Sequence, residues 1–242
     1  MLVRQAANVL ELLEFFARRR QPATLAEIAD DLGWPRSSTF NLVGTLADKG
    51  YLYEPRGRGG YYPSPRWMSV LGTVSDADPL PEKVITMVDE IGAETGETTA
   101  VGATSGTSVI FVYVRESTQP IRYFAQIGTR APIHASSAGR AILTQYTPQE
   151  RDALYRKITF TSHSPTTPMS VAAIESELRN ATERGYHHSD SEYVPDLAGV
   201  SLPLPLEHRR LSVVVVGPVS RCLERRPQTA EIMKRAMARF GF

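Results

Sequence analysis

Residues 25–52 have the sequence LAEIADDLGWPRSSTFNLVGTLADKGYL, and this stretch decides the fold of the amino-terminal third of the chain. Thr24 and Glu27 form a capping-box pattern, which predicts a helix that starts at residue 25. Gly33 is expected to end this helix, and Pro35 favours the first turn of another helix over about residues 35–49. Two helices separated by a short turn that contains glycine predict a helix-turn-helix.

The helix over 35–49 is expected to bury one face. That face is predicted to contain Leu42, Val43 and Leu46, together with either Thr39 or Phe40. An amphipathic helix is also predicted over residues 3–18, because apolar residues recur there at three- and four-residue spacing.

A hairpin is predicted directly after the helix-turn-helix. Residues 51–53 and 61–62 have the character of two short strands, and they flank the basic, glycine-rich segment RGRGG at residues 56–60. A helix-turn-helix followed by such a hairpin is the winged form. In that form the last helix enters the DNA major groove, and the wing meets the backbone or the minor groove.

The polar residues at the start of the helix over 35–49 suit DNA contact. Hydroxyl groups and helix N–H groups bond phosphate, whereas arginine and asparagine side chains can read base edges. Asn41 is the first choice for a base contact. The alternative is that the serines only cap the helix and the arginines are solvated surface. The full set of candidate DNA contacts is Arg36, Ser37, Ser38, Thr39, Asn41, Arg56 and Arg58.

Length and composition limit the number of domains, the location of the protein and the presence of disulfides. A length of 242 residues favours two domains, and the formal net charge of +1 says little about partners. Charge is divided unevenly, however, because residues 1–70 carry nine basic and seven acidic side chains. No apolar run long enough to span a membrane and no signal peptide is present, so a cytoplasmic protein without a membrane partner is expected. The single cysteine, Cys222, excludes an internal disulfide.

Several motifs spaced along the chain resemble the IclR family of bacterial transcriptional regulators, over essentially the whole length. They are the stretch 25–52, ETGET at 94–98, IGTRAPIHASSAGRA at 127–141, Gly185-Tyr186 and VGP at 216–218. The resemblance implies a homodimer, or a dimer of dimers, that binds a palindromic operator in double-stranded DNA. It also implies control by a small effector, commonly a carboxylic acid, which binds in the second domain.

The domain organisation follows from these patterns. We expect a winged helix-turn-helix domain over 1–65, a linker helix and hinge over 66–81, and an effector-binding domain over 82–242. Trp67, Met68 and Leu71 in the linker would serve dimer contacts or an ordinary core. Helices alternate in the last domain with strand-like stretches, including 98–103, 108–115, 121–126, 199–205 and 211–216. These predict an α+β fold with a mainly antiparallel sheet, which the resemblance sharpens to a GAF-like fold.

A ligand pocket is expected where His134–Arg140 starts a helix with small residues. Helix N–H groups at such a start can bind a carboxylate, although tight packing of the helix on the sheet would favour the same residues. The resemblance places effector-binding positions at Ser137 and Ala138, which would offer backbone donors to an acid, and at Ser189, Gly199, Val214 and Val216. Family members usually have Asp at position 189, Cys at 199 and polar residues at 214 and 216. The replacements predict a more apolar acid than glyoxylate or pyruvate.

Other functions have weaker support. A hydrolase is the main alternative, yet the nucleophile-elbow and phosphate-loop motifs are absent from the sequence. Cys222 beside Arg221 would suit an activated thiol or simple packing. His187, His188, Asp190 and Glu192 would suit a metal, but alternate residues of a strand point to opposite faces, which favours a structural role. No catalytic residue, metal or cofactor is therefore expected, and a DNA-binding protein with a degenerate sensing pocket remains an alternative.

Overall fold

The structure is a computed structural model that describes residues 3–55 and 59–242. The chain forms two compact units, Met1–Pro79 and Leu80–Phe242. Each unit has its own hydrophobic core. None of the helices in the described residues is long and apolar enough to cross a membrane.

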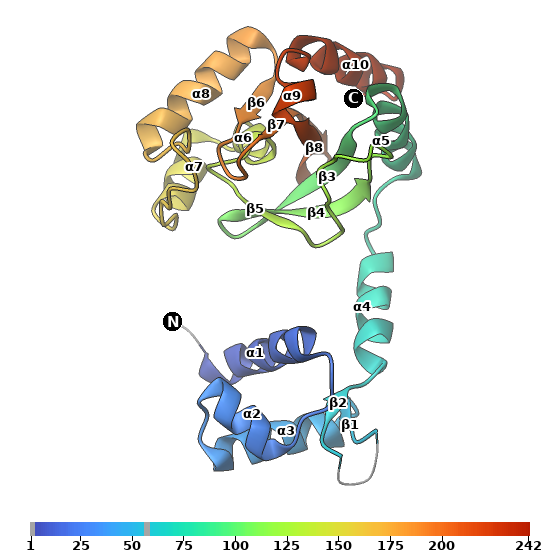
Figure 1. Ribbon diagram of the computed structural model, residues 1–242, viewed down its shortest axis with the longest axis vertical. Coiled ribbons are helices and arrows are strands. Elements are labelled where there is room, and N and C mark those ends of the chain that lie inside the picture. Colours follow the sequence, from blue (N-terminus) through green and yellow to red (C-terminus); the bar gives the residue numbers. More distant parts are fainter. Residues whose placement is uncertain (1–2, 56–58) are drawn as a thin grey trace. The chain divides into compact units, whose positions relative to one another are not determined.

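The first unit is a winged helix-turn-helix, as predicted (Figure 1). The Thr24 hydroxyl accepts a hydrogen bond from the Glu27 N–H group, and the Glu27 carboxylate accepts one from the Thr24 N–H group. This exchange, together with Arg19, lowers the pKa of Glu27 to about 2. Gly33 ends the helix with a φ of 64°. The elements in chain order are α1 (Arg4–Arg19), α2 (Leu25–Leu32), α3 (Arg36–Asp48), β1 (Leu52–Tyr53), β2 (Tyr62–Pro63) and α4 (Arg66–Asp76).

Thr39 and Phe40 resolve the alternative that the sequence left open on α3. Thr39 is fully buried, and its hydroxyl donates a hydrogen bond to the Pro35 carbonyl oxygen at 3.1 Å. Phe40 is 63% exposed. The buried position therefore belongs to Thr39, because the hydroxyl satisfies its own hydrogen-bonding need within the helix and leaves only a small side chain to pack.

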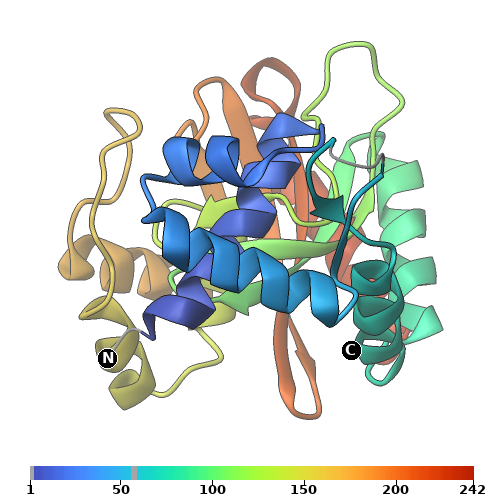
Figure 2. The same cartoon turned by 90° about the horizontal axis from the view of Figure 1, so that it is seen from below.

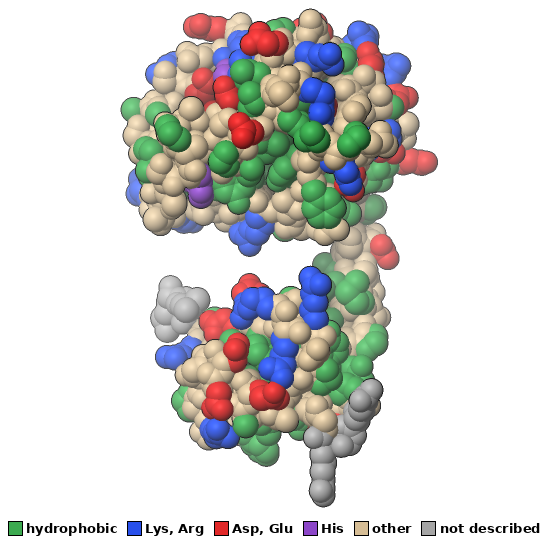
Figure 3. Space-filling view, viewed as in Figure 1, with side chains coloured by type: hydrophobic (Ala, Val, Ile, Leu, Met, Phe, Trp, Pro, Cys, Tyr) green, Lys and Arg blue, Asp and Glu red, His purple; other side chains and the backbone are tan. Residues whose placement is uncertain are grey.

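The helix α4 carries an exposed apolar surface. Met68, Leu71 and Val74 are all more than half exposed, and Figure 3 shows apolar side chains along this helix. Trp67 is held differently, since its indole N–H donates a hydrogen bond to the Tyr51 carbonyl oxygen at 2.9 Å.

The second unit is built on a six-stranded antiparallel sheet with the order β5-β4-β3-β8-β7-β6, which confirms the predicted α+β class. The β7–β8 hairpin projects beyond its neighbours (Figure 2). The strands are β3 (Thr98–Ser105), β4 (Ser108–Arg115), β5 (Arg130–Pro132), β6 (His187–Asp190), β7 (Leu197–Leu206) and β8 (Arg209–Pro218).

Helices cover both faces of this sheet (Figure 1). Side chains alternate along β8, so Val213 and Val215 pack under α5 and α10, whereas Val214 and Val216 pack with α6 and α8. The helices are α5 (Glu82–Thr95), α6 (Ser137–Leu143), α7 (Pro148–Tyr155), α8 (Val171–Arg184), α9 (Val219–Cys222) and α10 (Arg226–Arg239).

The strand predicted over 121–126 is wrong. Those residues form part of the connection between β4 and β5, and Ile121 and Phe124 are more than half exposed. The free edge of β4 is instead paired by Arg130–Pro132. Alternating apolar residues resemble a strand in sequence, but they form one only where an unpaired edge is available to them.

Candidate nucleic-acid interface and ligand pocket

The exposed face of α3 carries most of the predicted DNA contacts. Arg36, Ser37, Ser38 and Asn41 are all exposed in its first two turns. The Arg36 guanidinium lies 3.1 Å from an Asp30 carboxylate oxygen, and both side chains are 69% exposed. Such an exposed pair contributes little to stability, so the arginine can exchange its partner for a phosphate at small cost.

One of the predicted contacts does not lie on this face, and two others fall outside the described residues. The Thr39 side chain is in the core, so its hydroxyl is not available to DNA, and that part of the prediction is corrected. Arg56 and Arg58 lie outside the described residues.

A groove borders α3 and includes polar residues that the sequence reasoning missed. Arg4, Gln5 and Asn8 of α1 line it together with Ser38 and Asn41 of α3. Their polar character at the start of α1 was visible in the sequence. What the sequence could not supply was the packing that places the start of α1 beside α3.

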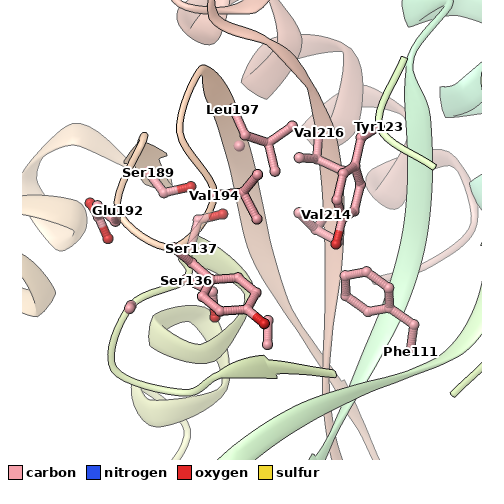
Figure 4. A pocket seen from close by; sticks show the side chains of 14 residues that line it. Phe111, Tyr123, Ser136, Ser137, Ser189, Glu192, Val194, Leu197, Val214 and Val216 are labelled. Carbon is pink, nitrogen blue, oxygen red and sulfur yellow. The ribbon is translucent and has the colours of Figure 1, made fainter. Parts of the chain in front are cut away.

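A pocket in the second unit opens between α6, β4 and the strands β6, β7 and β8 (Figure 4). Its empty space, including the part open to solvent, is about 430 Å³. Ser137 and Ser189 lie on one side of the pocket, whereas Phe111 and Tyr123 lie on the other. Apolar side chains contribute much of the remaining wall, among them Val194, Leu197, Val214 and Val216, and Tyr193 lines it as well.

Gly199 allows two serine hydroxyls to converge on the pocket. A Cβ atom at position 199 would lie 2.8 Å from the Ser137 hydroxyl oxygen and 2.9 Å from that of Ser189. Ser189 pairs with Gly199 across the β6–β7 ladder, which sets this closeness. The Ser137 hydroxyl is also fixed from beneath, because the buried Ser201 hydroxyl donates a hydrogen bond to it at 2.9 Å.

Five of the six predicted effector positions therefore line one pocket: Ser137, Ser189, Gly199, Val214 and Val216. Ala138 does not line it. Its side chain is buried in the hydrophobic core between the sheet and the helices α6 and α8. Ser136 lines the pocket in addition, and its hydroxyl caps α6 by accepting a hydrogen bond from the Gly139 N–H group at 3.2 Å.

A buried ion pair joins the pocket wall to a residue behind it. Arg140 is fully buried, and its guanidinium lies 2.6 Å and 3.0 Å from the two carboxylate oxygens of Glu192. The same guanidinium donates hydrogen bonds to the carbonyl oxygens of His134 and His188. Glu192 lines the pocket, and although burial raises its pKa, the adjacent Arg140 opposes that rise. Its carboxylate is therefore committed to Arg140.

The side chains considered for a metal or for catalysis are occupied otherwise. Among the described residues, no group of three or more His, Cys, Asp and Glu side chains could hold a metal ion. The His188 Nδ1 atom lies 3.0 Å from the Arg226 guanidinium. Burial lowers the pKa of His187 to about 3, and burial together with Glu97 raises the pKa of the Cys222 thiol to about 12. Cys222 is therefore not an activated thiol.

Comparison with known families gives two matches that together cover most of the chain. Residues 5–56 match the model of the IclR helix-turn-helix domain. Residues 73–239 match the model of the bacterial transcriptional regulator IclR C-terminal domain.

Named proteins match along nearly the same length. The chain is 27% identical over 228 residues to the acetate operon repressor of Salmonella typhimurium, covering 93% of this chain and 83% of that protein. It is 26% identical over 228 residues to the transcriptional repressor IclR of Escherichia coli, with the same two coverages.

Solved structures share the fold. An IclR homolog from Microbacterium hydrocarbonoxydans, complexed with 4-hydroxybenzoate, superposes with a TM-score of 0.77 at 21% identity and covers 98% of this chain and 97% of its own. An IclR transcriptional regulator from Alicyclobacillus acidocaldarius gives 0.76 at 19% identity, covering 99% of this chain and 98% of its own.

Proposed function

The chain belongs to the IclR family of bacterial transcriptional regulators, and from this premise we propose that a relatively apolar carboxylic acid, bound in the pocket of the second unit, controls its binding to DNA. The chain is a DNA-binding regulator rather than an enzyme, as its relatives are. The proposal concerns the chemistry of the effector and the residues that bind it.

One observation carries the choice of effector: the pocket has a small polar end and long apolar walls. The hydroxyls of Ser137 and Ser189 converge at Gly199, and each can donate a hydrogen bond to a carboxylate. The opposite wall contains Phe111, Val214 and Val216. A highly oxygenated acid would leave polar groups unpaired against these side chains, at about 1–3 kcal/mol for each group.

The aromatic side chains of the pocket suit an effector that contains a ring. Tyr123 and Phe111 lie across from the two serines and offer aromatic contact (Figure 4). The homolog complexed with 4-hydroxybenzoate supports an aromatic acid for this chain too. The Tyr123 hydroxyl would then bond a polar substituent at the far end of the ring.

The DNA contacts are proposed on the exposed face of α3. Ser37 and Ser38 bond phosphate, Arg36 binds the backbone, and Asn41 reads a base edge. The wing arginines, Arg56 and Arg58, are proposed to add backbone contacts. A palindromic operator would be bound by a homodimer or a dimer of dimers, in the cytoplasm.

Calorimetric titration tests the choice of effector. Benzoate and 4-hydroxybenzoate should bind more tightly than glyoxylate and pyruvate, and binding should change the affinity for DNA in a mobility-shift assay. The variant Gly199→Ala should weaken binding of the aromatic acids, because its Cβ atom would crowd both serine hydroxyls. Gly72→Ala is the matched control, since a Cβ atom there meets no described atom within 4 Å.

The outcome separates the rival functions. Tight binding of a two- or three-carbon oxo acid, without preference for the apolar acids, would reject the proposed effector class. Absence of any ligand effect across a metabolite library would favour the degenerate pocket instead.

A further inference from the structure

The exposed face of α3 contains an apolar residue that the polar contacts leave unexplained. Ser37, Phe40, Asn41 and Gly44 follow the spacing i, i+3, i+4 and i+7, so they lie together on one face of the helix. Phe40 is 63% exposed there. Single exposed apolar side chains are common on protein surfaces, so this exposure by itself does not identify a contact.

Gly44 supplies the second observation. A glycine inside a helix makes that helix less stable than an alanine would. Yet a Cβ atom at position 44 would meet no described atom within 4 Å apart from its chain neighbours and the backbone of α3 itself, so the packing of the other elements does not require a glycine there. A helix glycine that its own domain does not need is consistent with close approach of a partner.

The position of this face identifies the partner. The second helix of a helix-turn-helix lies in the major groove of DNA, and α3 is that helix. Thymine presents a 5-methyl group in that groove, and phenylalanine is one of the side chains that contact it. We infer that Phe40 reads a thymine through its 5-methyl group, and that Gly44, one turn further along, leaves room for the base pairs to approach. This inference rests on the proposed contact of α3 with the operator.

The test uses duplexes that differ only in methyl groups. A duplex enriched by the wild-type protein from a random-sequence pool is prepared with thymine, and again with deoxyuridine at one symmetric pair of positions at a time. At one such pair the wild type should lose about fourfold in affinity for each methyl group removed, which is the contribution of burying one carbon group. Phe40→Ala should bind the two duplexes equally, and Phe40→Leu should keep part of the discrimination.

Phe124→Ala is the matched control. Phe124 is 60% exposed, close to the exposure of Phe40, but it lies in the second unit. This variant should discriminate between the duplexes as the wild type does. Measurements at low salt keep the backbone contacts strong enough for every variant to bind.

The variant Gly44→Ala separates the effect of this position on helix stability from its effect on DNA affinity. It should raise the Tm of the protein by a few degrees, because alanine favours the helix, and yet lower its affinity for the enriched duplex. A more stable variant with unchanged affinity would overturn the role of Gly44.

The outcomes distinguish the inference from the function on which it rests. If the wild type enriches no duplex, the proposed operator contact through α3 is wrong. If the wild type binds a duplex, but the loss of thymine methyl groups weakens the wild type and Phe40→Ala equally, the operator contact stands and the inference about Phe40 is wrong.

Discussion

Arg36 and Arg140 show how differently the two units use the same side chain. Each lies in a helix and pairs with a carboxylate, but the Arg36–Asp30 pair has both side chains 69% exposed, whereas Arg140 is 0% and Glu192 12% exposed. An exposed pair can be broken and remade with a new partner, while a buried pair is costly to break. Arg36 therefore stays available to a new partner, whereas Arg140 fixes a pocket wall.

Removal of Arg140 should have the largest effect. Arg140→Ala would leave the Glu192 carboxylate buried without its counter-ion, at a cost of about 3–5 kcal/mol in the free energy of unfolding. Urea denaturation followed by circular dichroism measures this. The double variant Arg140→Met with Glu192→Gln should recover part of the loss, because neither buried charge remains. A single variant as stable as the wild type would contradict the structural role of the pair.

Acidification should destabilise the second unit, because that unit buries histidines whose pKa is lowered. Burial, reinforced by Arg140, lowers the pKa of His187 to about 3, whereas an unfolded histidine has a pKa of about 6.5. Below a pH of about 6.5, His187 binds a proton in the unfolded chain but not in the folded protein. The free energy of unfolding therefore falls as the pH falls. Between pH 6.5 and 5 the loss is about 2 kcal/mol for this residue.

The difference between variants isolates this contribution of His187. His187→Gln should flatten the dependence of unfolding free energy on pH, whereas His208→Gln should not, since the His208 side chain is 73% exposed. Equal slopes in wild type and His187→Gln would show that His187 does not titrate in this way.

A substitution at Thr39 tests whether its hydroxyl stabilises the fold without contacting DNA. Thr39→Val keeps the shape but removes the bond to the Pro35 carbonyl oxygen, which should cost about 1 kcal/mol of stability. Its affinity for DNA should match that of the wild type once the folded fraction is equal. A loss of affinity in the fully folded variant would return Thr39 to the DNA contacts.

The smallest effect on stability is expected for Arg36. Arg36→Ala should change the free energy of unfolding by less than about 0.5 kcal/mol, because the pair with Asp30 is exposed. It should nevertheless weaken binding to all DNA sequences and reduce the salt dependence by about one phosphate contact. Mobility shifts at several salt concentrations measure both, and an unchanged salt slope would remove Arg36 from the interface.

Local signals in the sequence predicted the features that depend on near neighbours. The capping box at Thr24 is an example, because its two partners, Thr24 and Glu27, lie three residues apart. Local signals could not decide in the same way which of Thr39 and Phe40 is buried. Adjacent positions on a helix both lie near the edge of its buried face, and only the packing of the other elements decides between them.

The same distinction holds for the pocket. Its position followed from the family resemblance, but the ion pair at its wall joins residues 140 and 192, which are 52 positions apart. Nothing local in the sequence pairs Arg140 with Glu192, and the sequence reasoning considered Glu192 only as a candidate metal ligand. Contacts of this kind depend on the sheet order, which brings β6 and α6 together.

Gly199 has a consequence for how such regulators diversify. The strand around it is fixed by pairing on both sides, with β6 and with β8, so the backbone stays in place when the side chain changes. A side chain at this one position fills or frees the space before both serines without disturbing the ion pair behind them. If the pocket binds the effector as proposed, a single codon change here would shift effector preference, while the DNA-binding unit and its target genes remain the same.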